Sequence, residues 1–530
     1  MSAITPQTEL RLIKCPIESD NRNQLTFSNA TAQYNYFNSL PHLEVDNFTY
    51  QRKDNVIRYP AHIDSILTYN YVMYKNENYT NKWFYAFITK MEYVNDNMTL
   101  ISIHTDVYQT WMFSMVWKKS FVEREHVNND TLGLHTIPEG LELGEYVCTK
   151  VDSADGIFEN LCIVTASTVG PSDLESYDMN LYNNIPSPVV YCRWDLDNTS
   201  SGLAGLKSFI NTLNNNSKID AMQYMFFAPT WLCEKNAGTV YIKESNNYNT
   251  YTLELNGITS LNGYTPTNKK LLCYPYCYFG MSNSVGQFNV LKQELWEKYQ
   301  GVYNVLVDGV LSAGCSIKAI PYRYKGIYEN FDEGITVGKF PQLSWTNDLY
   351  TNWQTQNGIN IAGIRLNATE AGYLKAGAQL AVGTALASSG DIVGGGSLVA
   401  GGVNSVFNTM QEQYQHSLQP NGVEGSLNAG DITTIAGGNK LFVYTYTIKQ
   451  EYAKIIDNFF NLYGYKVNDL KIPNITGRTN WNYVKTNGAN IEGDIPEDHL
   501  NEIKTIFNNG VTLWHNSSTY LDYSQSNAIV

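Results

Sequence analysis

The chain has 530 residues, of which 43% are hydrophobic and 13% aromatic, so it is excluded from the disordered class and can bury several cores. Its formal net charge of −14 argues against a protein that binds nucleic acid by neutralising phosphates, because such binding needs an excess of Lys and Arg. The 39 tyrosines favour many short strands, since tyrosine fits half-buried pleated surfaces. We therefore expect a β-dominated α+β fold with several discontinuous domains.

The first twenty residues show no apolar stretch behind a basic one, so we expect synthesis in a cytoplasm without a secretory signal. The eight cysteines are scattered over the first 315 residues without C-x2-C spacing. Even the closest pair, Cys273 and Cys277, has the wrong spacing for a zinc ribbon. We expect mostly free, buried thiols and no metal or cofactor.

The clearest local pattern lies in the N-terminal part. Two β-rich runs at 83–93 and 98–104 flank the turn-forming NDN at 95–97, which predicts a β-hairpin. The segment 106–125 follows, and its closely spaced Met, Phe and Trp residues predict a short helix and then a strand.

Residues 146–345 consist of short apolar runs separated by Asn, Gly, Ser and Pro, which is typical of a β-dominated domain. The pattern predicts helices only at 203–213 and 290–299. Further along, LFVYTYT at 441–447 predicts a strand, the apolar spacing over 449–463 predicts a helix, and a strand is expected near 481–485. A last helix should open at Pro496, with Glu497 and Asp498 in its first turn.

Residues 376–411 differ from the rest of the chain, because they contain a single charged residue, Asp391. Three consecutive glycines at 394–396 should break a helix, so a hairpin is expected rather than one long rod. The first half, 375–389, would rise about 22 Å as a helix, which is less than the roughly 30 Å of bilayer hydrocarbon. One copy is therefore a poor transmembrane anchor.

Two interpretations of this segment remain open. Several copies that meet in lipid could pack through small residues spaced four apart, and Asp391, near the expected hairpin tip, would then make insertion easier in mild acid. Alternatively, the segment is a packing element or a subunit contact that never meets lipid. The residues that would carry membrane activity are Ala376, Gly377, Ala381, Gly383, Ala387, Asp391, Gly394, Gly395, Gly396, Leu398, Val399, Val403 and Phe407.

No motif of catalytic grade is present in the sequence. Glu123 and Glu125 are two residues apart, and Glu139, Glu142 and Glu145 recur every third residue, but clusters of this kind are common on exposed faces of an acidic protein. The eight histidines form no H-E-x-x-H pair, and neither a phosphate-binding loop nor a G-x-S-x-G elbow occurs. We expect a protein without enzymatic activity.

Four motifs resemble the distal tail-knob (tail tube) proteins of small podoviruses of Gram-positive bacteria (Picovirinae type). They are WFYAFI at 83–88, YVNDNMT at 93–99, DVYQTW at 106–111 and SFVEREH at 120–126. The Gly- and Ala-rich insert at 376–407, followed by an Asn- and Trp-containing tail, fits the layout of that family. The likeness covers most of the chain and is firmest over 80–130.

The resemblance implies a structural virion protein at the tail tip whose subunits form a hollow hexameric tube. It implies homo-oligomeric contacts, contacts with other tail proteins, and double-stranded DNA that passes through the lumen without specific binding. Apolar loops, matched here by 376–407, would plug the tube and then enter the host cytoplasmic membrane as a pore. On this basis 1–145 and 346–530 would build the tube, and 146–345 a knob elaboration.

Two other functions remain alternatives. Abundant Tyr and Trp would suit a receptor- or carbohydrate-binding virion protein, although this does not explain the apolar insert. A wall-degrading glycosidase of the tail would need two facing carboxylates. Binding of glycans without lysis would distinguish the former from the latter.

Overall fold

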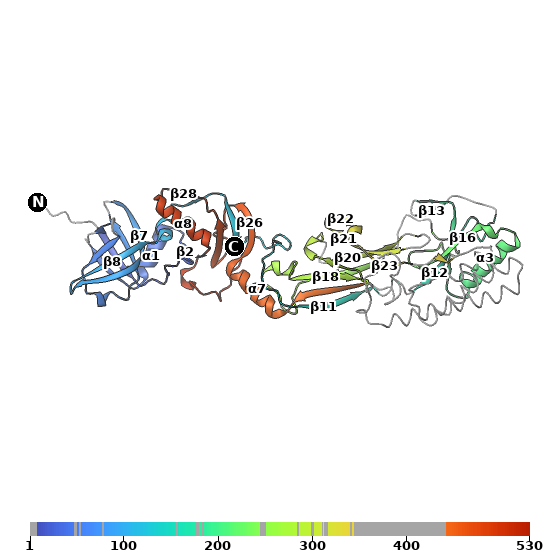
Figure 1. Cartoon of the computed structure of the whole chain (residues 1–530), viewed down its shortest axis with the longest axis horizontal. Coiled ribbons are helices and arrows are strands. Elements are labelled where there is room, and N and C mark those ends of the chain that lie inside the picture. Colours follow the sequence, from blue (N-terminus) through green and yellow to red (C-terminus); the bar gives the residue numbers. More distant parts are fainter. Residues whose placement is uncertain are drawn as a thin grey trace. The chain divides into compact units, whose positions relative to one another are not determined.

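The computed structural model describes residues 8–343 and 441–530, apart from short gaps at 47–49, 52–54, 77–78, 155–156, 158–159, 175–179, 183–184, 244–250, 284–285, 298–301, 310, 312–315 and 340–341. The chain divides into two compact units (Figure 1). Unit 1 comprises Met1–Leu143, Tyr264–Leu271 and Gln450–Val530, and unit 2 comprises Gly144–Gly263 and Leu272–Lys449. Strands far outnumber helices in both units, which confirms the β-dominated fold class.

Unit 1 contains a seven-stranded sheet formed by the N-terminal part of the chain. Its order is β3-β1-β6-β7-β8-β5-β4. The strands are β1 (Thr8–Ile13), β3 (His42–Asp46), β4 (Tyr50–Gln51), β5 (Val56–Tyr59), β6 (Tyr71–Asn76), β7 (Tyr79–Asn95) and β8 (Met98–Thr105). Strands β7 and β8 pair antiparallel up to Asn95 and Met98, which confirms the predicted hairpin.

Both faces of this sheet are buried. Along β6, Val72 and Tyr74 belong to one hydrophobic cluster, whereas Tyr71 and Met73 belong to another that includes Phe37 of helix α1 (Ala30–Ser39). Neighbouring strand residues point to opposite sides, so a run of four buried residues indicates cover on both faces. This explains why the sequence here is continuously apolar rather than alternating.

The second sheet of unit 1 joins the two ends of the chain. Its order is β2-β29-β27-β10-β26, with β2 parallel to β29 and the other pairs antiparallel. The strands are β2 (Asn23–Leu25), β10 (Ser120–Glu125), β26 (Tyr465–Lys471), β27 (Trp481–Asn487) and β29 (Val511–Trp514), and β9 (Val116–Trp117) pairs separately with β28 (Ile491–Glu492). The buried rings of Trp481 and Trp514 lie 5.1 Å apart in its core.

Three further helices of unit 1 confirm the sequence predictions: α2 (Val107–Trp111), α7 (Gln450–Tyr463) and α8 (Glu497–Asn509). The buried Asp457 of α7 holds the short segment Tyr264–Leu271 in this unit. Its carboxylate accepts hydrogen bonds from the Tyr264 hydroxyl at 2.7 Å and from the backbone N–H groups of Thr267 and Asn268 at 2.8 and 3.0 Å.

Unit 2 contains three larger sheets, of order β11-β25-β18-β19, β15-β12-β16-β24 and β17-β20-β21-β22 with β23 beside β21, and the pair β13-β14. Its strands are β11 (Tyr146–Ser153), β12 (Leu161–Ser167), β13 (Asn180–Tyr182), β14 (Ile185–Ser187), β15 (Val190–Asp195), β16 (Met222–Pro229), β17 (Tyr251–Asn256), β18 (Cys277–Ser282), β19 (Phe288–Leu291), β20 (Val302–Gly309), β21 (Ser316–Tyr324), β22 (Ile327–Glu329), β23 (Ile335–Lys339), β24 (Gln342–Leu343) and β25 (Phe442–Ile448).

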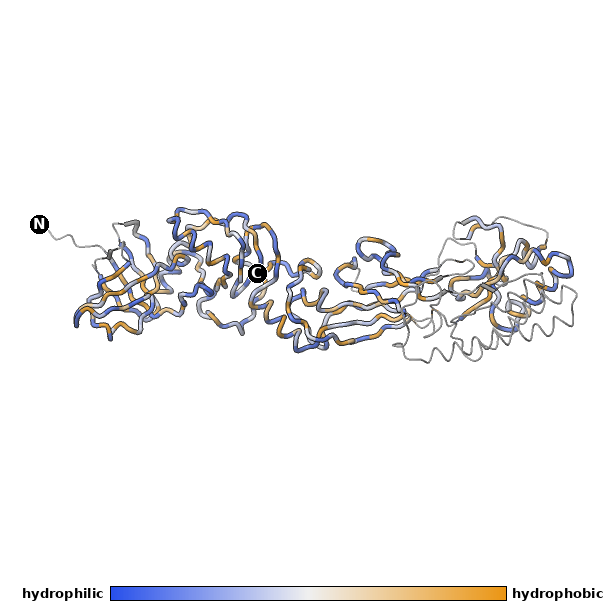
Figure 2. The backbone as a smooth tube through the Cα atoms, viewed as in Figure 1, coloured by the Kyte–Doolittle hydropathy of each residue, from blue (hydrophilic) through white to orange (hydrophobic). Residues whose placement is uncertain are grey.

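The strands of unit 2 show two patterns of burial. β12 is buried at every residue between β15 and β16, whereas β20 alternates between half-buried and buried residues. Figure 2 shows the alternation of hydrophobic and hydrophilic residues along many strands. Helix α3 (Leu203–Asn215) confirms the predicted helix and stacks Phe209 on Trp194, with ring centroids 6.0 Å apart.

The helix predicted at 290–299 is wrong. β19 extends to Leu291 and is followed by a short 3-10 helix, Gln293–Leu295. The cause is a long-range contact. The Gln293 side chain is buried, accepts a hydrogen bond from the Ile258 N–H at 2.8 Å and donates one to the Ile258 carbonyl at 3.2 Å. A contact with a residue 35 positions away therefore outweighs the local preference for helix.

Candidate functional site

The predicted membrane-active segment lies outside the described residues. All of its named positions fall between residues 376 and 407, within the undescribed interval 344–440. Its membrane role therefore stays a prediction. The most distinctive surface that the structure does describe is on unit 2.

An aromatic surface covers one side of the sheet β11-β25-β18-β19. Along β25, Val443 and Thr445 are buried, whereas Phe442, Tyr444 and Tyr446 are only half-buried. Successive residues of a strand point to opposite faces, so the sequence FVYTYT places its three aromatic rings on the same side of the sheet.

The neighbouring strands extend this row of rings. Tyr446 is paired with Tyr278 of β18, and their rings stack with centroids 5.2 Å apart. Tyr444 lies 6.1 Å from Tyr446, and Tyr146 of β11 lies 5.3 Å from Tyr278. Aromatic cross-strand pairs stabilise a sheet by about 0.2–1 kcal/mol each, so this row also holds the four strands together.

Gly280 of β18 makes room for a further ring. A Cβ atom at this position would collide with the side chain of Phe288, which lies over it from β19. Phe288 is nevertheless 50% exposed, because only one of its sides is covered. A glycine is therefore needed here to make room for the tip of the Phe288 ring over the sheet.

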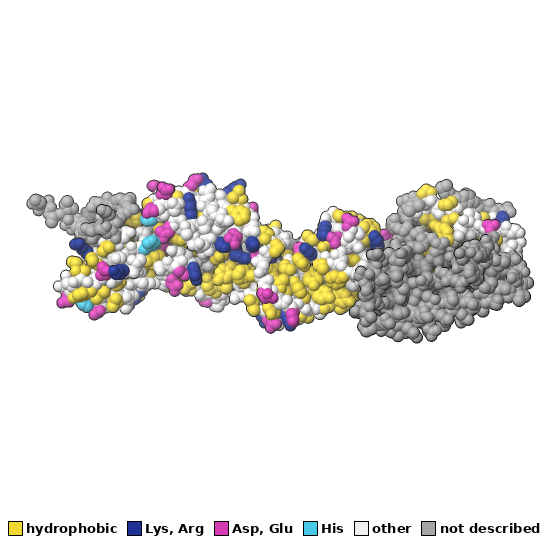
Figure 3. All heavy atoms as spheres, viewed as in Figure 1, with side chains coloured by type: hydrophobic (Ala, Val, Ile, Leu, Met, Phe, Trp, Pro, Cys, Tyr) yellow, Lys and Arg dark blue, Asp and Glu magenta, His cyan; other side chains and the backbone are white. Residues whose placement is uncertain are grey.

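We call this surface the tyrosine face and define it by Tyr146, Val151, Tyr274, Tyr278, Phe288, Phe442, Tyr444 and Tyr446. Figure 3 shows hydrophobic side chains gathered over β11 and β18. Burial raises the pKa of Tyr278 and Tyr444, so their hydroxyls stay uncharged at neutral pH. Contiguous apolar patches of this kind on soluble proteins mark interaction surfaces.

Two ion pairs lie beside the tyrosine face, and the Lys292 ammonium group lies 4.1 Å from the ring centroid of Tyr274. Lys150 forms an ion pair with Asp152 at 2.7 Å, and Lys449 forms one with Glu145 at 2.5 Å. The Tyr146 hydroxyl donates a hydrogen bond to the Pro275 carbonyl at 2.8 Å. Apart from Lys292, the charges named here offset one another, which suits a packed contact better than attraction of a charged ligand.

Three of the carboxylates considered for hydrolysis, Glu123, Glu125 and Glu139, form ion pairs within unit 1. The side chain of Glu139 is fully buried and paired with both Arg124 and Lys270. Glu125 is buried against Lys471 and also accepts a hydrogen bond from the Asn474 N–H at 2.7 Å. Such pairing is typical of structural carboxylates rather than of a glycosidase pair facing a cleft.

Glu123 contacts Lys485 at 2.9 Å, so it too has a cationic partner. Across the residues that the structure describes, no three His, Cys, Asp or Glu side chains gather as a metal site would require. Cys15, Cys162, Cys192, Cys233, Cys273 and Cys277 are free and buried and Cys148 is free and exposed, as expected for most of them, while Cys315 lies outside the described part. Among the described helices, none is long and apolar enough to cross a membrane.

Sequence reasoning missed the tyrosine face as a site. The alternation of aromatics at 442–446 was a visible signal, but it was used only to predict a strand. The contributions of Tyr146, Tyr278 and Phe288 depend on strand pairing over long sequence distances, which the sequence pattern does not contain.

Comparison with known proteins extends over nearly the whole chain. The family model of the C-terminal domain of the tail knob protein gp9 of Bacillus phage phi29 matches residues 239–528, and the model of the N-terminus of caudoviral major tail proteins matches residues 6–118. The chain is 27% identical to the phi29 tail knob protein gp9, with 96% of each chain covered. It is 28% identical to gp9 of Bacillus phage B103, with 98% of each covered.

A solved structure shares the fold. The tail knob protein gp12 of bacteriophage C1 superposes with a TM-score of 0.59 at 14% identity and covers 99% of this chain and 100% of its own. Together with the family model, which matches more than half of the sequence, these likenesses confirm the resemblance drawn from the four N-terminal motifs. The chain belongs to the family of phi29-type tail knob proteins and is a structural protein of the phage virion tail.

Proposed function

We propose that the chain is the subunit of a distal tail tube, a closed ring of identical copies that conducts DNA during ejection. Membership of the tail knob family carries this proposal. The net charge of −14 supports it, because a wall along which DNA must slide should not attract phosphates. We expect six copies, on the basis of the family resemblance alone.

The tyrosine face is the proposed contact between copies. An exposed apolar surface of this kind is an aggregation hazard in a free subunit, and a neighbouring copy would cover it. Aromatic residues are enriched at protein interfaces and charged residues are depleted from interface centres, as on this sheet. A head-to-tail contact repeats from copy to copy, so it forms a ring where the rotation between copies closes, whereas a self-complementary contact stops at a dimer.

Ring formation is tested by native mass spectrometry and negative-stain imaging of the purified chain. Phe288→Glu combined with Val151→Glu places two charges on the tyrosine face, at positions that are at least half exposed, and should leave monomers. Ile327→Glu, an exposed apolar position on β22 of the same unit, is the matched control and should still form hollow rings. Wild-type protein that stays monomeric at high concentration would overturn the ring, and rings from the double variant would exclude the tyrosine face as the contact.

We further propose that residues 376–407 plug the tube and then enter the host cytoplasmic membrane together as a pore. Their composition supports this, because an apolar, Gly-rich segment needs concealment and a ring provides it. Dye release from liposomes should be lost when 376–407 is replaced by a short polar linker, while ring assembly stays intact. Asp391→Asn should weaken the increase of leakage in mild acid. Equal leakage from the linker variant and the wild type would show that the segment serves only in packing.

A further inference from the structure

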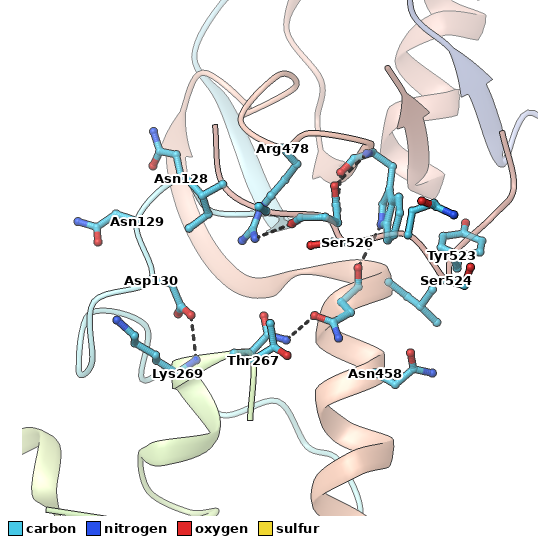
Figure 4. A pocket seen from close by; sticks show the side chains of 18 of the residues that line it. Asn128, Asn129, Asp130, Thr267, Lys269, Asn458, Arg478, Tyr523, Ser524 and Ser526 are labelled. Atoms are coloured by element: carbon cyan, nitrogen blue, oxygen red, sulfur yellow. Dashed lines mark hydrogen bonds between the residues drawn. The ribbon is translucent and has the colours of Figure 1, made fainter. Parts of the chain in front are cut away.

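A polar cavity of about 630 Å³ opens in unit 1 (Figure 4). The loop after β10, the 267–269 segment, the end of α7, the start of β27 and the C-terminal segment 523–529 line it. Asn527 fixes the C-terminal segment, because its side-chain oxygen accepts hydrogen bonds from the N–H groups of Asn480 and Trp481 at 3.0 and 3.1 Å. The walls are therefore held in place without a ligand.

Arg478 is the principal charged group of the cavity. Its guanidinium donates hydrogen bonds to the carbonyls of Val127 at 2.9 Å and Asn527 at 3.3 Å, and its Nε is buried without an acceptor. No carboxylate in the described part of the chain forms an ion pair with it, although the negative charge of the nearby Asp130 acts to raise its pKa. Burial lowers the pKa of Arg478, but a guanidinium stays charged in a protein. A partly buried cation without a direct ion-pair partner is unfavourable, and an anion in the cavity would reduce that penalty.

The other ionisable groups that line the cavity leave it positive. Lys269 is a second cation at the exposed rim. Asp130 is the acidic group of the lining, and both of its oxygens are already engaged, one with the Lys269 N–H and one with the Tyr465 hydroxyl, each at 2.8 Å. In a chain with a net charge of −14, a cavity with this balance is suited to an anion.

Neutral polar groups complete the lining. Asn128 and Asn458 are exposed at the rim, and within the described ranges neither side chain makes a hydrogen bond. A free amide both donates and accepts, which suits the hydroxyls of a polyol. Tyr523, 38% exposed, offers part of a ring against which the C–H groups of such a ligand can pack.

We propose that this cavity binds a small polyol that carries one oxyanion, a phosphorylated or carboxylated sugar-like molecule. Arg478 holds the oxyanion, and Asn128 and Asn458 bind the hydroxyls. Figure 4 shows the Arg478 side chain directed toward the space between Asp130 and Ser526, with Asn128 and Asn458 at its borders. All of the lining residues belong to unit 1.

Isothermal titration calorimetry on the full chain compares four probes: glycerol 3-phosphate, glucuronate, glycerol and inorganic phosphate. The two anionic polyols should bind saturably with a Kd below about 1 mM, and glycerol should bind at least about tenfold more weakly. The anionic polyol that binds more tightly tells whether the natural ligand carries a phosphate or a carboxylate group. If inorganic phosphate binds as tightly as glycerol 3-phosphate, the cavity holds an adventitious ion only. That result would overturn the proposal that the cavity recognises the hydroxyls of a polyol. Absence of binding by both anionic polyols would overturn the site.

Variants separate this site from non-specific charge attraction. Asn458→Asp adds a carboxylate at the rim and should weaken binding of the anionic polyols by about tenfold. Asn501→Asp, the same change at an exposed position of α8, is the matched control and should leave binding unchanged. Arg478→Met should abolish binding. If that variant does not fold, the two Asn→Asp variants still decide, and equal affinities for both would overturn the site.

Discussion

Both units pack aromatic rings at similar spacing but cover them differently. In unit 1 the rings of Trp481 and Trp514 lie 5.1 Å apart and are almost completely buried. In unit 2 the rings of Tyr446 and Tyr278 lie 5.2 Å apart on a face that remains partly open. The distance between two rings therefore does not distinguish a buried core from an exposed surface. What distinguishes them is the layer of residues that covers the rings. We infer that in unit 2 a second copy of the chain supplies that layer.

The largest effect on folding is expected when one of the buried rings of unit 1 is removed. Trp481→Ala should lower the free energy of unfolding of unit 1 by about 3–5 kcal/mol, because it leaves a large cavity in the core and also removes the indole hydrogen bond to the Asn461 carbonyl. Urea unfolding followed by circular dichroism measures this loss. A decrease below about 1 kcal/mol would mean that the core of unit 1 can collapse around the gap.

A charge substitution gives the next largest difference between the units. Glu139→Gln leaves Arg124 and Lys270 without their shared carboxylate in the interior of unit 1 and should cost about 3 kcal/mol. Glu145→Gln is the matched control, because that carboxylate of unit 2 is paired only with Lys449 at the solvent-exposed surface. The control should unfold like the wild type. Equal effects of both changes would contradict the distinction between buried and exposed pairs.

The units should also differ in their response to acid. His126 of unit 1 uses both ring nitrogens, one with the Asn461 carbonyl at 3.0 Å and one as acceptor from the Tyr483 N–H at 2.7 Å. Burial, with a contribution from the charge of Arg478, lowers its pKa from 6.5 to about 3. Between these values the unfolded chain binds a proton that the folded unit does not, so stability is lost as the pH falls below 6.5. Unit 2 has no histidine among its described residues.

We therefore expect unit 1 to lose up to about 1.4 kcal/mol for each pH unit between 6.5 and 3 through His126 alone. Burial raises the pKa of Asp106 to about 6, which acts in the opposite sense over part of this range. His126→Gln isolates the effect of the imidazole, because it should flatten the dependence without removing Asp106. Hydrogen exchange of peptides from each unit at pH 7 and pH 5 measures it. The same slope in both proteins would exclude His126 as the cause.

The smallest effect on folding is expected on the tyrosine face. Phe288→Ser should change the free energy of unfolding by less than about 1 kcal/mol, since half of the side chain is already in water. Urea unfolding of the isolated subunit tests this. A loss as large as that of Trp481→Ala would show that the face belongs to the core of unit 2 rather than to a contact.

Local patterns were sufficient to predict much of the fold. The hairpin of β7 and β8 and helices α3, α7 and α8 were predicted, because their turns, caps and apolar spacing are encoded within short windows. The pairing of β2 with β29 was not predictable, since it joins residues almost 500 positions apart. The same holds for Asp457, which fixes the segment Tyr264–Leu271 through contacts that no local pattern reveals.

The candidate sites were harder to predict from the sequence than the fold was. The aromatic alternation at 442–446 was visible, but the tyrosine face depends on which strands lie beside β25. The Arg478 cavity requires five separate segments to meet, and a lone arginine in the sequence is not a signal. The opposite holds for the segment 376–407. Its composition makes it distinctive in the sequence, but it lies outside the residues that the structure describes.

The parallel pairing of β2 with β29 also bears on the order of events during translation. The second sheet of unit 1 cannot be completed until residues 511–514 have left the ribosome, although its first strand is made among the first 25 residues. Unit 2 ends at Lys449, so the strands that the structure describes in it have all been made by then. The middle of the chain can thus be complete while β2, one of the first strands to be made, still lacks its parallel partner, which reverses the usual order of domain folding on the ribosome.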